Sequence, residues 1–420
     1  MLILKNGTFI DWQTLEFIQT DILVEPGSAG ALRFSGNFHE IKDCRVIDCT
    51  GKFITKSFAN GHHHAYSALS RGMPSPGKNP ENFLEILKFV WWTLDKAIDA
   101  DILQASALVT AMASAKNGVT FIIDHHASPH AIQGSLAIIA RAFDQVGVGH
   151  LLCYEISDRD GLDIAKIGLS ETDQYLSNHQ GLVGLHASCT VGNSTLQSAM
   201  RLAKDNNSGI HIHVAEDISD EQHCVHHYHQ RIIERLTNAG ALQFSKTILA
   251  HCLHLDDHEK ALVAASPAWV VQNMESNLNN AVGLFQSSGL GPHIMLGTDG
   301  MYSDMLRSAK AAFFAGKQAD TLDYDGTYQR FRNIHHYLDE NHFAGDGENN
   351  LVVFDYPTPT PFTHENFPGH FLFGLESKHV SHVISQGKLI VEKGNLLTVN
   401  EQDILRESRI QAKRLWERMK

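Results

Sequence analysis

The sequence is poor in the features that mark secreted, zinc-ribbon and membrane proteins. Its 420 residues hold six scattered cysteines without a Cys-x-x-Cys pair, so neither a zinc ribbon nor a disulfide framework is indicated. No run approaches the roughly 18 apolar residues of a membrane span. The N-terminus also lacks the basic start and long apolar core of a signal peptide. We therefore expect a cytoplasmic protein with no membrane partner.

Positive charge is scarce as well. The chain has 34 basic residues against 47 acidic ones, a formal net charge of −13, and no long block of Lys or Arg. A nucleic-acid partner requires a basic surface, so we expect none, and a small-molecule substrate is the default. A homo-oligomer is not excluded. The 43% of apolar residues suffices for a large hydrophobic core.

The two ends of the chain are rich in short strands. Residues 1–55 show brief apolar runs between turn signals, without a helical period. The same pattern returns near residue 350, with strands expected at Leu351–Phe354, Val380–Ser385 and Lys388–Glu392, and a closing helix from about Asn400 to Met419. We expect residues 1–55 and 349–420 to form one small β module.

The middle of the chain, residues 56–348, alternates strands with helices. Apolar runs are expected to form strands at residues 58–64, 119–124, 149–154, 182–185, 210–214, 247–250, 268–271 and 293–296. Continuous apolar strands are typical of a parallel sheet that is buried on both faces. Eight βα units favour an α/β fold of the (β/α)₈ TIM-barrel type, and an open sheet of six or seven strands is the alternative.

Helices are expected between most of these strands. Two precede residue 119, over about 80–97 and about 101–117. A third is expected to start at the N-cap Ser194 and to end before Gly209. A fourth carries Val225 and Leu236 on one face and ends at Gly240.

Three consecutive histidines end the first of the middle strands. On a strand, His62 and His64 point to one face and His63 points to the other. Two imidazoles with this spacing make half of a metal site. The alternative is a surface loop, because some of the chain's 27 histidines must cluster by chance.

Polar side chains also end nearly all of the remaining middle strands, at the edge where a barrel of this type carries its active site. They are His125, His126, Glu155, His186, His213, His251, Asn273 and Asp299. Such regularity strengthens the metal hypothesis for the three histidines.

Three of these strand ends carry the chemistry. A metal ion lowers the pKa of bound water from about 15.7 to about 7, and a nearby carboxylate then carries the proton. His213 could be a ligand of such an ion, and Glu216 could be the carboxylate. Asp299, in Thr298-Asp299-Gly300, is a ligand, a base or both. His251 could polarise the bond under attack. The alternatives are buried core histidines, a Glu that starts a helix, and an ordinary Asp-Gly turn.

In this order, His62-x-His64, His213-x-x-Glu216, His251 and Thr298-Asp299-Gly300 resemble the amidohydrolase superfamily. More narrowly, the chain is similar to the deaminase and chlorohydrolase branch with a single metal, and to the SsnA-type aminohydrolases in the phrases at residues 91–95, 124–129 and 154–161. The resemblance covers essentially the whole chain. It implies a (β/α)₈ barrel plus a β-sandwich made from both termini.

The resemblance also implies roles for single residues. His62, His64, His213 and Asp299 would bind one divalent ion. By the resemblance this ion is Zn²⁺, and Fe²⁺ or Mn²⁺ also suits the same ligands. Glu216 would carry protons, Asp299 would also act as the base, and His251 would orient or polarise the substrate. The expected substrate contacts are His186, His126, Trp92, Arg159 and Asn277.

One metal is expected rather than two, because two-metal relatives bridge their ions with an anion from the fourth strand. That strand offers His186 here, with no Lys or Glu between Gly181 and Cys189. A neutral imidazole cannot bridge two cations.

Several interpretations stay open. Trp91 and Trp92 either line a pocket or pack in a core, and Arg159 either binds an anionic group or forms a salt bridge in its own loop. His223 and His227 are expected on a solvated helix face, and at most one of His125 and His126 can face inward. Three stretches depart from the family pattern: Lys56-Ser57, Gln272-Asn273-Met274, and about residues 316–347, which are shorter and less typical than expected.

The sequence therefore predicts a metal-dependent hydrolase of non-peptide C–N bonds. The expected reaction is deamination of a purine-, pyrimidine- or triazine-like amino-heterocycle by an activated water. Hydrolysis of a cyclic amide or a carbon–halogen bond is the rival reaction on the same site. A barrel that binds a metal or ligand without turnover is the rival from another class, and the presence of Glu216 argues against it.

Overall fold

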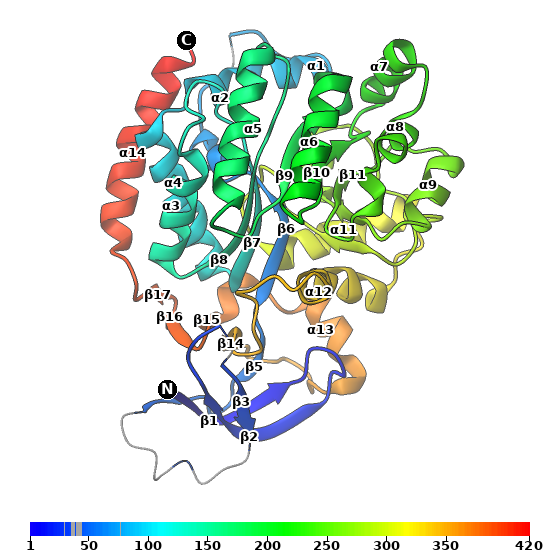
Figure 1. Cartoon of the computed structure of the whole chain (residues 1–420). Helices are drawn as coiled ribbons and strands as arrows, with labels where there is room; N and C mark the ends of the chain where they lie inside the picture. The colour runs from blue at the N-terminus through cyan, green and yellow to red at the C-terminus, as the bar shows by residue number, and fades with distance from the viewer. Residues whose placement is uncertain (29, 35–37, 39–43, 76) are drawn as a thin grey trace.

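The computed structural model describes residues 1–420 except 29, 35–37, 39–43 and 76. It has a large α/β body, and a smaller β-rich part lies at the end where the chain enters the body (Figure 1). Mixed α/β content was expected, and most predicted strands agree with the structure within two residues. Strands 149–154, 210–214, 351–354, 380–385 and 388–392 have the predicted bounds.

The body is built on parallel strands whose side chains are buried on both faces. β6, β7 and β8 pair in one sheet, and β9 to β13 pair in sequence order in another. The strands are β6 (Phe58–His63), β7 (Val119–His126), β8 (Gly149–Tyr154), β9 (Val183–Ala187), β10 (Ile210–Val214), β11 (Ile248–His251), β12 (Trp269–Gln272) and β13 (Ile294–Leu296).

Isolated bridges connect the two sheets on both sides. The pairs Leu152–Gly181 and Ile156–Leu185 link the β8 region to the β9 region. The pair His63–Asp299 links the end of β6 to the residues that follow β13. A Cβ atom on Gly61 would lie 2.8 Å from the Leu296 carbonyl oxygen, so β6 approaches β13 closely. The carboxyl ends of strands from both sheets therefore meet in one region.

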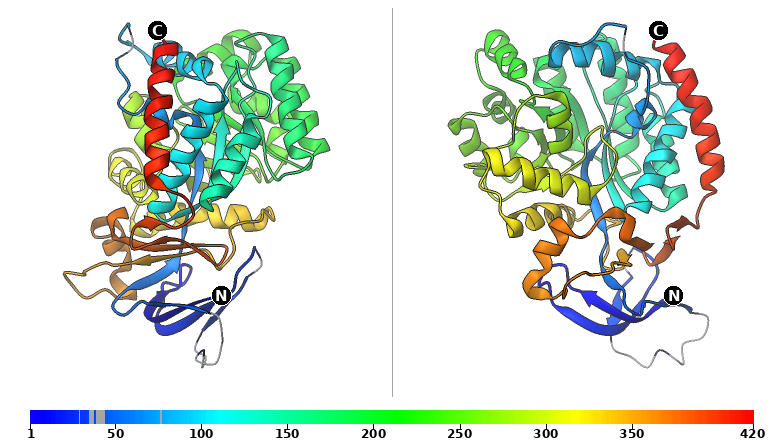
Figure 2. Two further views of the ribbon diagram at one scale, coloured as in Figure 1. Left: turned by 90° about the vertical axis from the view of Figure 1, so that its left-hand side faces the viewer. Right: turned by 180° about the vertical axis from the view of Figure 1, so that it is seen from behind.

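Helices surround these strands in all three ribbon views (Figures 1 and 2). Several end at a glycine with positive φ, such as α4 at Gly147 and α8 at Gly240, where a side chain would be strained. They are α3 (Ala100–Lys116), α4 (Ser135–Val146), α5 (Leu162–Leu176), α6 (Asn193–Asp205), α7 (Ile218–Tyr228), α8 (Ile232–Ala239), α9 (Asp257–Ala264), α10 (Met274–Asn280), α11 (Met305–Ala319) and α12 (Tyr324–Glu340).

Three helix predictions need correction. The N-cap of α6 is Gly192, so Ser194 already lies in the first turn. The single helix expected to end at Gly240 is two helices, because His229 adopts a left-handed φ of 56° after α7. The helix expected over 80–97 contains a π-helical turn at Leu87–Trp91, between α1 (Phe83–Ile86) and α2 (Trp92–Ala97).

Strands from both termini join in one nine-stranded sheet of the described residues. Its centre is the antiparallel pair of β5 and β14, which joins the two ends of the chain. The closing helix α14 (Glu401–Arg418), capped by Asn400, reaches back to the body, where Trp416 donates to the Leu69 carbonyl oxygen. The strands are β1 (Leu2–Ile10), β2 (Phe17–Val24), β3 (Leu32–Phe34), β4 (Arg45–Asp48), β5 (Phe53–Lys56), β14 (Leu351–Phe354), β15 (Val380–Ser385), β16 (Lys388–Glu392) and β17 (Asn395–Leu396).

A buried ionic cluster lies where β5 leads into β6. We call Lys56, His335 and Asp346 the junction cluster. The Lys56 ammonium donates to the Asp346 carboxylate at 3.0 Å and to the carbonyl oxygens of Asp346 and Gly347 at 3.0 and 2.8 Å. The second carboxylate oxygen is 2.6 Å from Nδ1 of His335. These bonds use all three N–H donors of the lysine. They explain how a charged residue is tolerated in the interior at Lys56, where the sequence departs from the family pattern.

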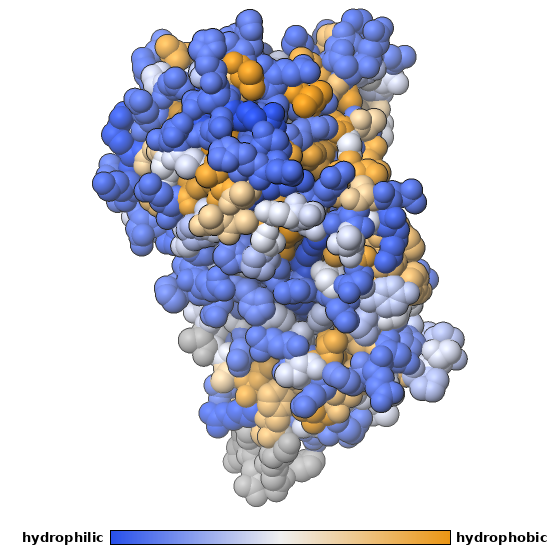
Figure 3. All heavy atoms as spheres, turned by 90° about the vertical axis from the view of Figure 1, so that its right-hand side faces the viewer, coloured by the Kyte–Doolittle hydropathy of each residue, from blue (hydrophilic) through white to orange (hydrophobic). Residues whose placement is uncertain are grey.

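The described residues include no helix that is long and apolar enough to span a membrane. The face in Figure 3 carries hydrophilic side chains over most of its area, with separate apolar patches between them. A homo-oligomer stays a prediction.

Candidate active site

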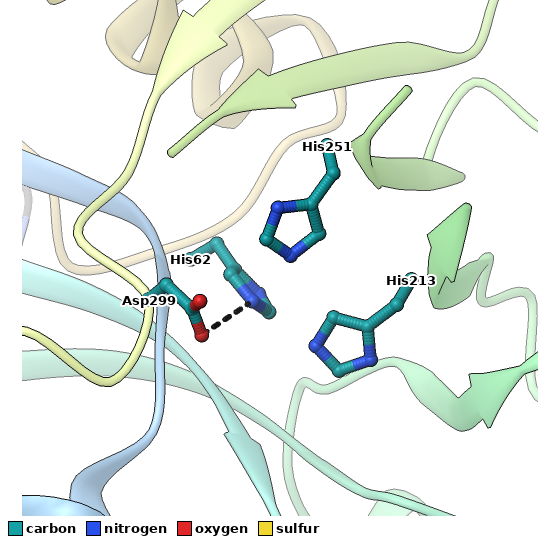
Figure 4. A group of neighbouring side chains, drawn as sticks. All are labelled: His62, His213, His251 and Asp299. Atoms are coloured by element: carbon teal, nitrogen blue, oxygen red, sulfur yellow. Dashed lines mark ion pairs between the residues drawn. The ribbon is translucent and has the colours of Figure 1, made fainter. Parts of the chain in front are cut away.

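Four buried side chains from different strands converge at the carboxyl ends of the strands. His62 lies in β6, His213 lies in β10, His251 ends β11 and Asp299 follows β13. Their rings and carboxylate point toward one another (Figure 4). One potential ligand atom from each lies within 4.8 Å of the others.

His64 belongs to the same cluster. Its Nε2 atom lies 2.9 Å from Oδ1 of Asp299 and 3.2 Å from Nε2 of His213. His62 directs its Nε2 atom to the same carboxylate oxygen at 3.6 Å, and among the described residues this nitrogen has no hydrogen-bond partner. The structure therefore brings together all the residues that the sequence predicts as metal ligands.

The hydrogen bonds of the rings fix where their protons are. Nδ1 of His64 faces the His125 carbonyl oxygen at 2.5 Å, and Nδ1 of His213 faces the His186 carbonyl oxygen at 2.8 Å. A carbonyl oxygen can only accept, so each Nδ1 must carry a hydrogen. In the neutral rings both Nε2 atoms then present lone pairs to each other and to Asp299.

This donor set fits a divalent metal ion. Two imidazole lone pairs and a carboxylate oxygen repel one another unless a cation or a proton lies between them. Ligand atoms at about 2.0–2.1 Å from a tetrahedral zinc lie about 3.4 Å apart, close to the separations of 2.9 to 3.6 Å found here. Burial lowers the pKa of His64, but the Asp299 carboxylate outweighs it and raises that pKa to about 9. The position therefore favours positive charge.

His251 presents a proton to the cluster rather than a lone pair. The Asn277 amide nitrogen lies 2.8 Å from Nδ1 of His251, so this nitrogen accepts and Nε2 carries the hydrogen. Nε2 lies 3.5 Å from a carboxylate oxygen of Glu216 and has no hydrogen-bond partner among the described residues. The ring is therefore a hydrogen-bond donor facing the cluster.

The pKa values of two carboxylates of the cluster are shifted in opposite directions. Burial raises the pKa of Glu216 well above its ordinary value, and the nearby Asp299 charge raises it further. Burial also acts against ionised Asp299, but the neighbouring His62 and His64 rings outweigh it and hold its pKa well below the ordinary value. A protonated acid beside an ionised base is a common arrangement for acid–base chemistry.

The backbone around the cluster is strained. Ala215, His251, Cys252 and Asp299 have φ angles of 45°, 75°, 56° and 53°, a region that residues other than glycine adopt rarely. All four follow or end a parallel strand. Strain of this kind gathers at functional sites, because the surrounding structure must hold it in place.

A pocket opens above the cluster, with an empty volume of about 790 Å³. Phe83, Leu87, Trp91 and Trp92, from the helices with the π-helical turn, form an apolar wall. The polar lining residues include Glu155, His186, Arg159, Asp95 and Asn280. The pocket therefore combines apolar, aromatic side chains with polar ones.

The predicted substrate contacts divide into two groups. Trp92, Arg159 and His186 line the pocket. The Arg159 guanidinium is already paired, with the carboxylates of Asp95 and Asp160. His126 and Asn277 are not part of the lining: the ring of His126 bonds to the Ser128 hydroxyl at 2.8 Å, and Asn277 supports His251.

The structure also places near the site several residues that the sequence analysis did not assign to it. Ser276 donates to Asp299, and Asn280 donates to Glu216 at 3.3 Å; both come from α10, where no motif marked them. His125 points to Glu155 and to the cluster, so it is the inward member of its pair. Its place at the end of β7 was the available signal. His63 bonds to the Thr298 hydroxyl at 3.0 Å, away from the ligand atoms.

Comparisons with known proteins place the chain in a family. A model of the amidohydrolase family matches residues 53–329. The chain is 24% identical to a 5-methylthioadenosine/S-adenosylhomocysteine deaminase of Thermoanaerobacter pseudethanolicus, across 99% of this chain and 100% of that one. It is 26% identical to a 5′-deoxyadenosine deaminase of Methanopyrus kandleri, across 84% of this chain and 85% of that one.

Solved structures show the same fold. A zinc-bound adenosine deaminase from Xanthomonas campestris superimposes with a TM-score of 0.83 at 18% identity, covering 99% of this chain and 98% of that one. A zinc complex of atrazine chlorohydrolase from Arthrobacter aurescens gives 0.80 at 16% identity, covering 98% and 100%. The chain belongs to the amidohydrolase family and is a hydrolase.

Proposed function

We propose that this protein is a metal-dependent deaminase of an amino-substituted heterocycle of purine, pyrimidine or triazine type. The observation that carries the proposal is the meeting of two unlike sets of groups. His64, His213 and Asp299 direct lone pairs to one point, while His251 and Glu216 direct protons toward the same space. Relatives named as nucleoside deaminases support this substrate class.

The finer architecture is part of the proposal. Residues 56–348 form a closed (β/α)₈ barrel, supported by the bridges between the two parallel sheets. Residues 1–55 and 349–420 form the composite β-sandwich with the C-terminal helix. The protein acts in the cytoplasm on a small molecule.

The ligands of the metal ion are His62, His64, His213 and Asp299. The nitrogen and oxygen donor set suits zinc, and also Fe²⁺ or Mn²⁺. When bound, the ion supplies Lewis-acid chemistry and lowers the pKa of a water molecule at the site.

The protein's own residues then move the protons. A water oxygen bonds to the ring carbon that carries the amino group, and Asp299 takes a proton from the water. Glu216 delivers a proton to the ring nitrogen, and Nε2–H of His251 stabilises the negative charge that develops at the reacting centre. The amino nitrogen then takes the proton held by Asp299, the C–N bond breaks and ammonia leaves. The remaining hydroxyl proton passes to Glu216 as the C=O bond forms, which restores both carboxyl groups and leaves an intact oxo ring.

The pocket accommodates a flat ring. Trp91 and Trp92 offer aromatic faces, and His186 and Glu155 offer polar groups beside the cluster. The pairing of Arg159 with Asp95 and Asp160 favours a positioning role for that arginine over direct binding of an anion. Asn277 acts through His251, and His126 supports the wall behind the pocket.

Hydrolysis of a carbon–chlorine bond is the second candidate, because an atrazine chlorohydrolase shares the fold. The relatives named as deaminases favour deamination over this reaction. An amine must be protonated to leave, whereas chloride leaves without a proton, and Asp299 can return the water proton to the amine.

Ammonia release from a panel of amino-purines, amino-pyrimidines and amino-triazines tests the proposal. The wild-type chain, from medium replete in zinc, should release ammonia from at least one compound and leave the ring intact. Asp299→Ala should lose both the metal and the activity, whereas Asp346→Ala in the junction cluster should keep both in its folded fraction. Equal metal content and activity in wild type and Asp299→Ala would refute it.

A further inference from the structure

A second cavity, with an empty volume of about 810 Å³, lies beside the pocket above the metal-binding cluster. The two share a wall, because Ser67 and Gly300 line both. The Ser67 hydroxyl donates to the His64 carbonyl oxygen at 2.8 Å and lies 3.2 Å from the Gly300 carbonyl oxygen, so this wall joins the segments after His64 and after Asp299. The second cavity is also lined by His63, the histidine that turns away from the ligand atoms.

The charge of this cavity is opposite to that of the rest of the molecule. Its described lining holds two arginines and no acidic residue, and we call it the arginine cavity. Arg71 directly follows the 3₁₀ helix Ala65–Ser70, and Arg307 lies in the first turn of α11. The pocket above the metal-binding cluster is instead lined by six acidic residues and a single arginine. A cavity that carries only positive charge in a chain of net charge −13 attracts anions.

Arg71 has N–H donors that no group of the described chain accepts. Its guanidinium carbon lies 4.1 Å from the centre of the Tyr302 ring, so the guanidinium stacks on that ring. Stacking leaves the N–H groups in the plane of the guanidinium free to bind an anion. Among the described residues, Arg71 has no carboxylate partner, and the Tyr302 hydroxyl has no hydrogen-bond partner.

Arg307 also retains donors. Its Nε atom donates to the Glu275 carboxylate at 2.5 Å, and its two terminal nitrogens have no partner among the residues that the structure describes. Asp304, the N-cap of α11, accepts from the backbone N–H of Arg307 and from the Ser377 hydroxyl rather than from the guanidinium. Neither Glu275 nor Asp304 lines the arginine cavity.

Hydroxyl groups add uncharged donors to the lining. Ser303 is buried, and its oxygen accepts from the Asn60 amide at 3.1 Å, whereas its own hydrogen has no acceptor within the described chain. The Ser70 hydroxyl has no hydrogen-bond partner there either. Two guanidinium groups and several hydroxyls match an anion with at least three acceptor oxygens, which a phosphate group offers.

We propose that the arginine cavity binds a phosphate group through the guanidinium groups of Arg71 and Arg307 and the hydroxyl of Tyr302. The source of the group is inorganic phosphate or a small phosphate monoester. A group bound here contacts both segments that carry the metal ligands His64 and Asp299, without entering the pocket where the substrate reacts. The site does not depend on the proposed function.

Phosphate binding by the zinc-loaded full chain tests the site. Equilibrium dialysis with radiolabelled inorganic phosphate should give one equivalent per chain. Arg71→Gln, which keeps a polar side chain but removes the charge, should weaken binding by about 10–100-fold, the effect of losing charge-assisted hydrogen bonds. Arg307→Gln should weaken it too, by a smaller factor, because Glu275 already uses one nitrogen of this arginine.

Three controls define what is bound. Arg201→Gln is the matched variant, because Arg201 is an exposed arginine on α6 whose printed partner is the Ser198 hydroxyl rather than a carboxylate, and it should bind phosphate as the wild type does. Removal of zinc with a chelator should leave phosphate binding unchanged, since the arginine cavity contains no metal ligand. Competition by ribose 5-phosphate, with ribose as the uncharged control, distinguishes the sources. Tighter binding of ribose 5-phosphate than of inorganic phosphate identifies a monoester as the occupant, and the reverse identifies free phosphate.

The opposing outcomes are equally distinct. Wild-type protein that binds neither phosphate compound overturns the proposal, as do equal affinities in the wild type and Arg71→Gln. Equal losses in Arg71→Gln and Arg201→Gln show an adventitious ion only. Binding that disappears with the zinc assigns the phosphate to the metal and also overturns the arginine cavity. None of these results changes the expected release of ammonia, so the proposed function stands or falls separately.

Discussion

Two buried clusters of charged and polar side chains lie at opposite ends of β6, and they differ in how their hydrogen bonds are matched. In the junction cluster, every donor of the Lys56 ammonium meets an acceptor, and Asp346 receives both Lys56 and His335. At the carboxyl end, His64 and His213 turn lone pairs toward Asp299.

The difference separates a structural role from a chemical one. A matched buried ion pair needs no further group, and it fixes the chain where the two parts of the molecule meet. A cluster of acceptors that face one another needs a cation or a proton between them, and its strand-end position among buried side chains favours a chemical role. Both clusters are rich in charge, and the matching of donors with acceptors tells them apart.

The largest expected effect is on Glu216, the acid of the cluster around Asp299. Glu216→Gln keeps the shape of the side chain but cannot deliver a proton. We expect kcat to fall by about 10²–10⁴-fold, the contribution of one acid–base group, while the zinc content stays unchanged. Steady-state ammonia release, with zinc analysis of the same sample, checks this. A variant with wild-type kcat would remove Glu216 from the mechanism.

Substitutions in the junction cluster should change the stability of the protein rather than its activity. Asp346→Asn leaves the Lys56 ammonium buried without its carboxylate, and loss of one partner of a buried pair costs about 3–5 kcal/mol. Urea unfolding should show this loss in the free energy of unfolding. Zinc content and kcat per folded molecule should match the wild type, and a loss of zinc would contradict the separation of the two clusters.

A smaller effect on activity is expected at Asn277. Its amide fixes the proton of His251 on Nε2, and a residue that orients an active-site group is typically worth about 10–100-fold. Asn277→Ala should lower kcat by this factor. Asn277→Asp has the same size but accepts a proton from Nδ1, so it should not restore kcat. A wild-type rate in Asn277→Asp would show that the tautomer of His251 does not matter.

The smallest effect is a pH dependence of stability at the junction cluster. Burial raises the pKa of Asp346, but His335 and Lys56 outweigh it and lower that pKa to about 2, from 3.8. A lowered carboxyl pKa adds stability that is complete above pH 4 and is lost as the pH falls through 2. This amounts to about 2 kcal/mol.

Urea unfolding from pH 5 to pH 2 measures this dependence. The wild type should lose more stability across the range than Asp346→Asn, which has no carboxylate to protonate at this position. Equal slopes for the two proteins would contradict the assignment.

The sequence predicted the parts of the site that depend on local pattern. Strand alternation placed His62 and His64 on one face, and the apolar runs located the strand ends that hold His213 and Asp299. The resemblance to the amidohydrolases then assigned their roles, and the family was confirmed. The closed barrel, the domain bounds and the residue roles stay predictions.

Features that depend on contacts distant in sequence could not be predicted. The Asp346 partner of Lys56 lies 290 residues further along the chain, and Asn280 meets Glu216 across 64 residues. The choice between His125 and His126 as the inward residue depends on the register of β7 with its neighbours. The left-handed angles at His251 and Asp299 arise from tertiary packing, since neither residue type requires them.

The stabilisation of the metal-free chain by zinc tests the central claim most directly. Ligand that binds the folded state alone stabilises it by about 4 kcal/mol at 1,000 times its Kd. We predict this increase in the urea unfolding free energy for the wild type and for Asp346→Asn, and none for Asp299→Asn. An equal increase in Asp299→Asn, or no increase in the wild type, would contradict the assignment of the cluster around Asp299 as the metal site.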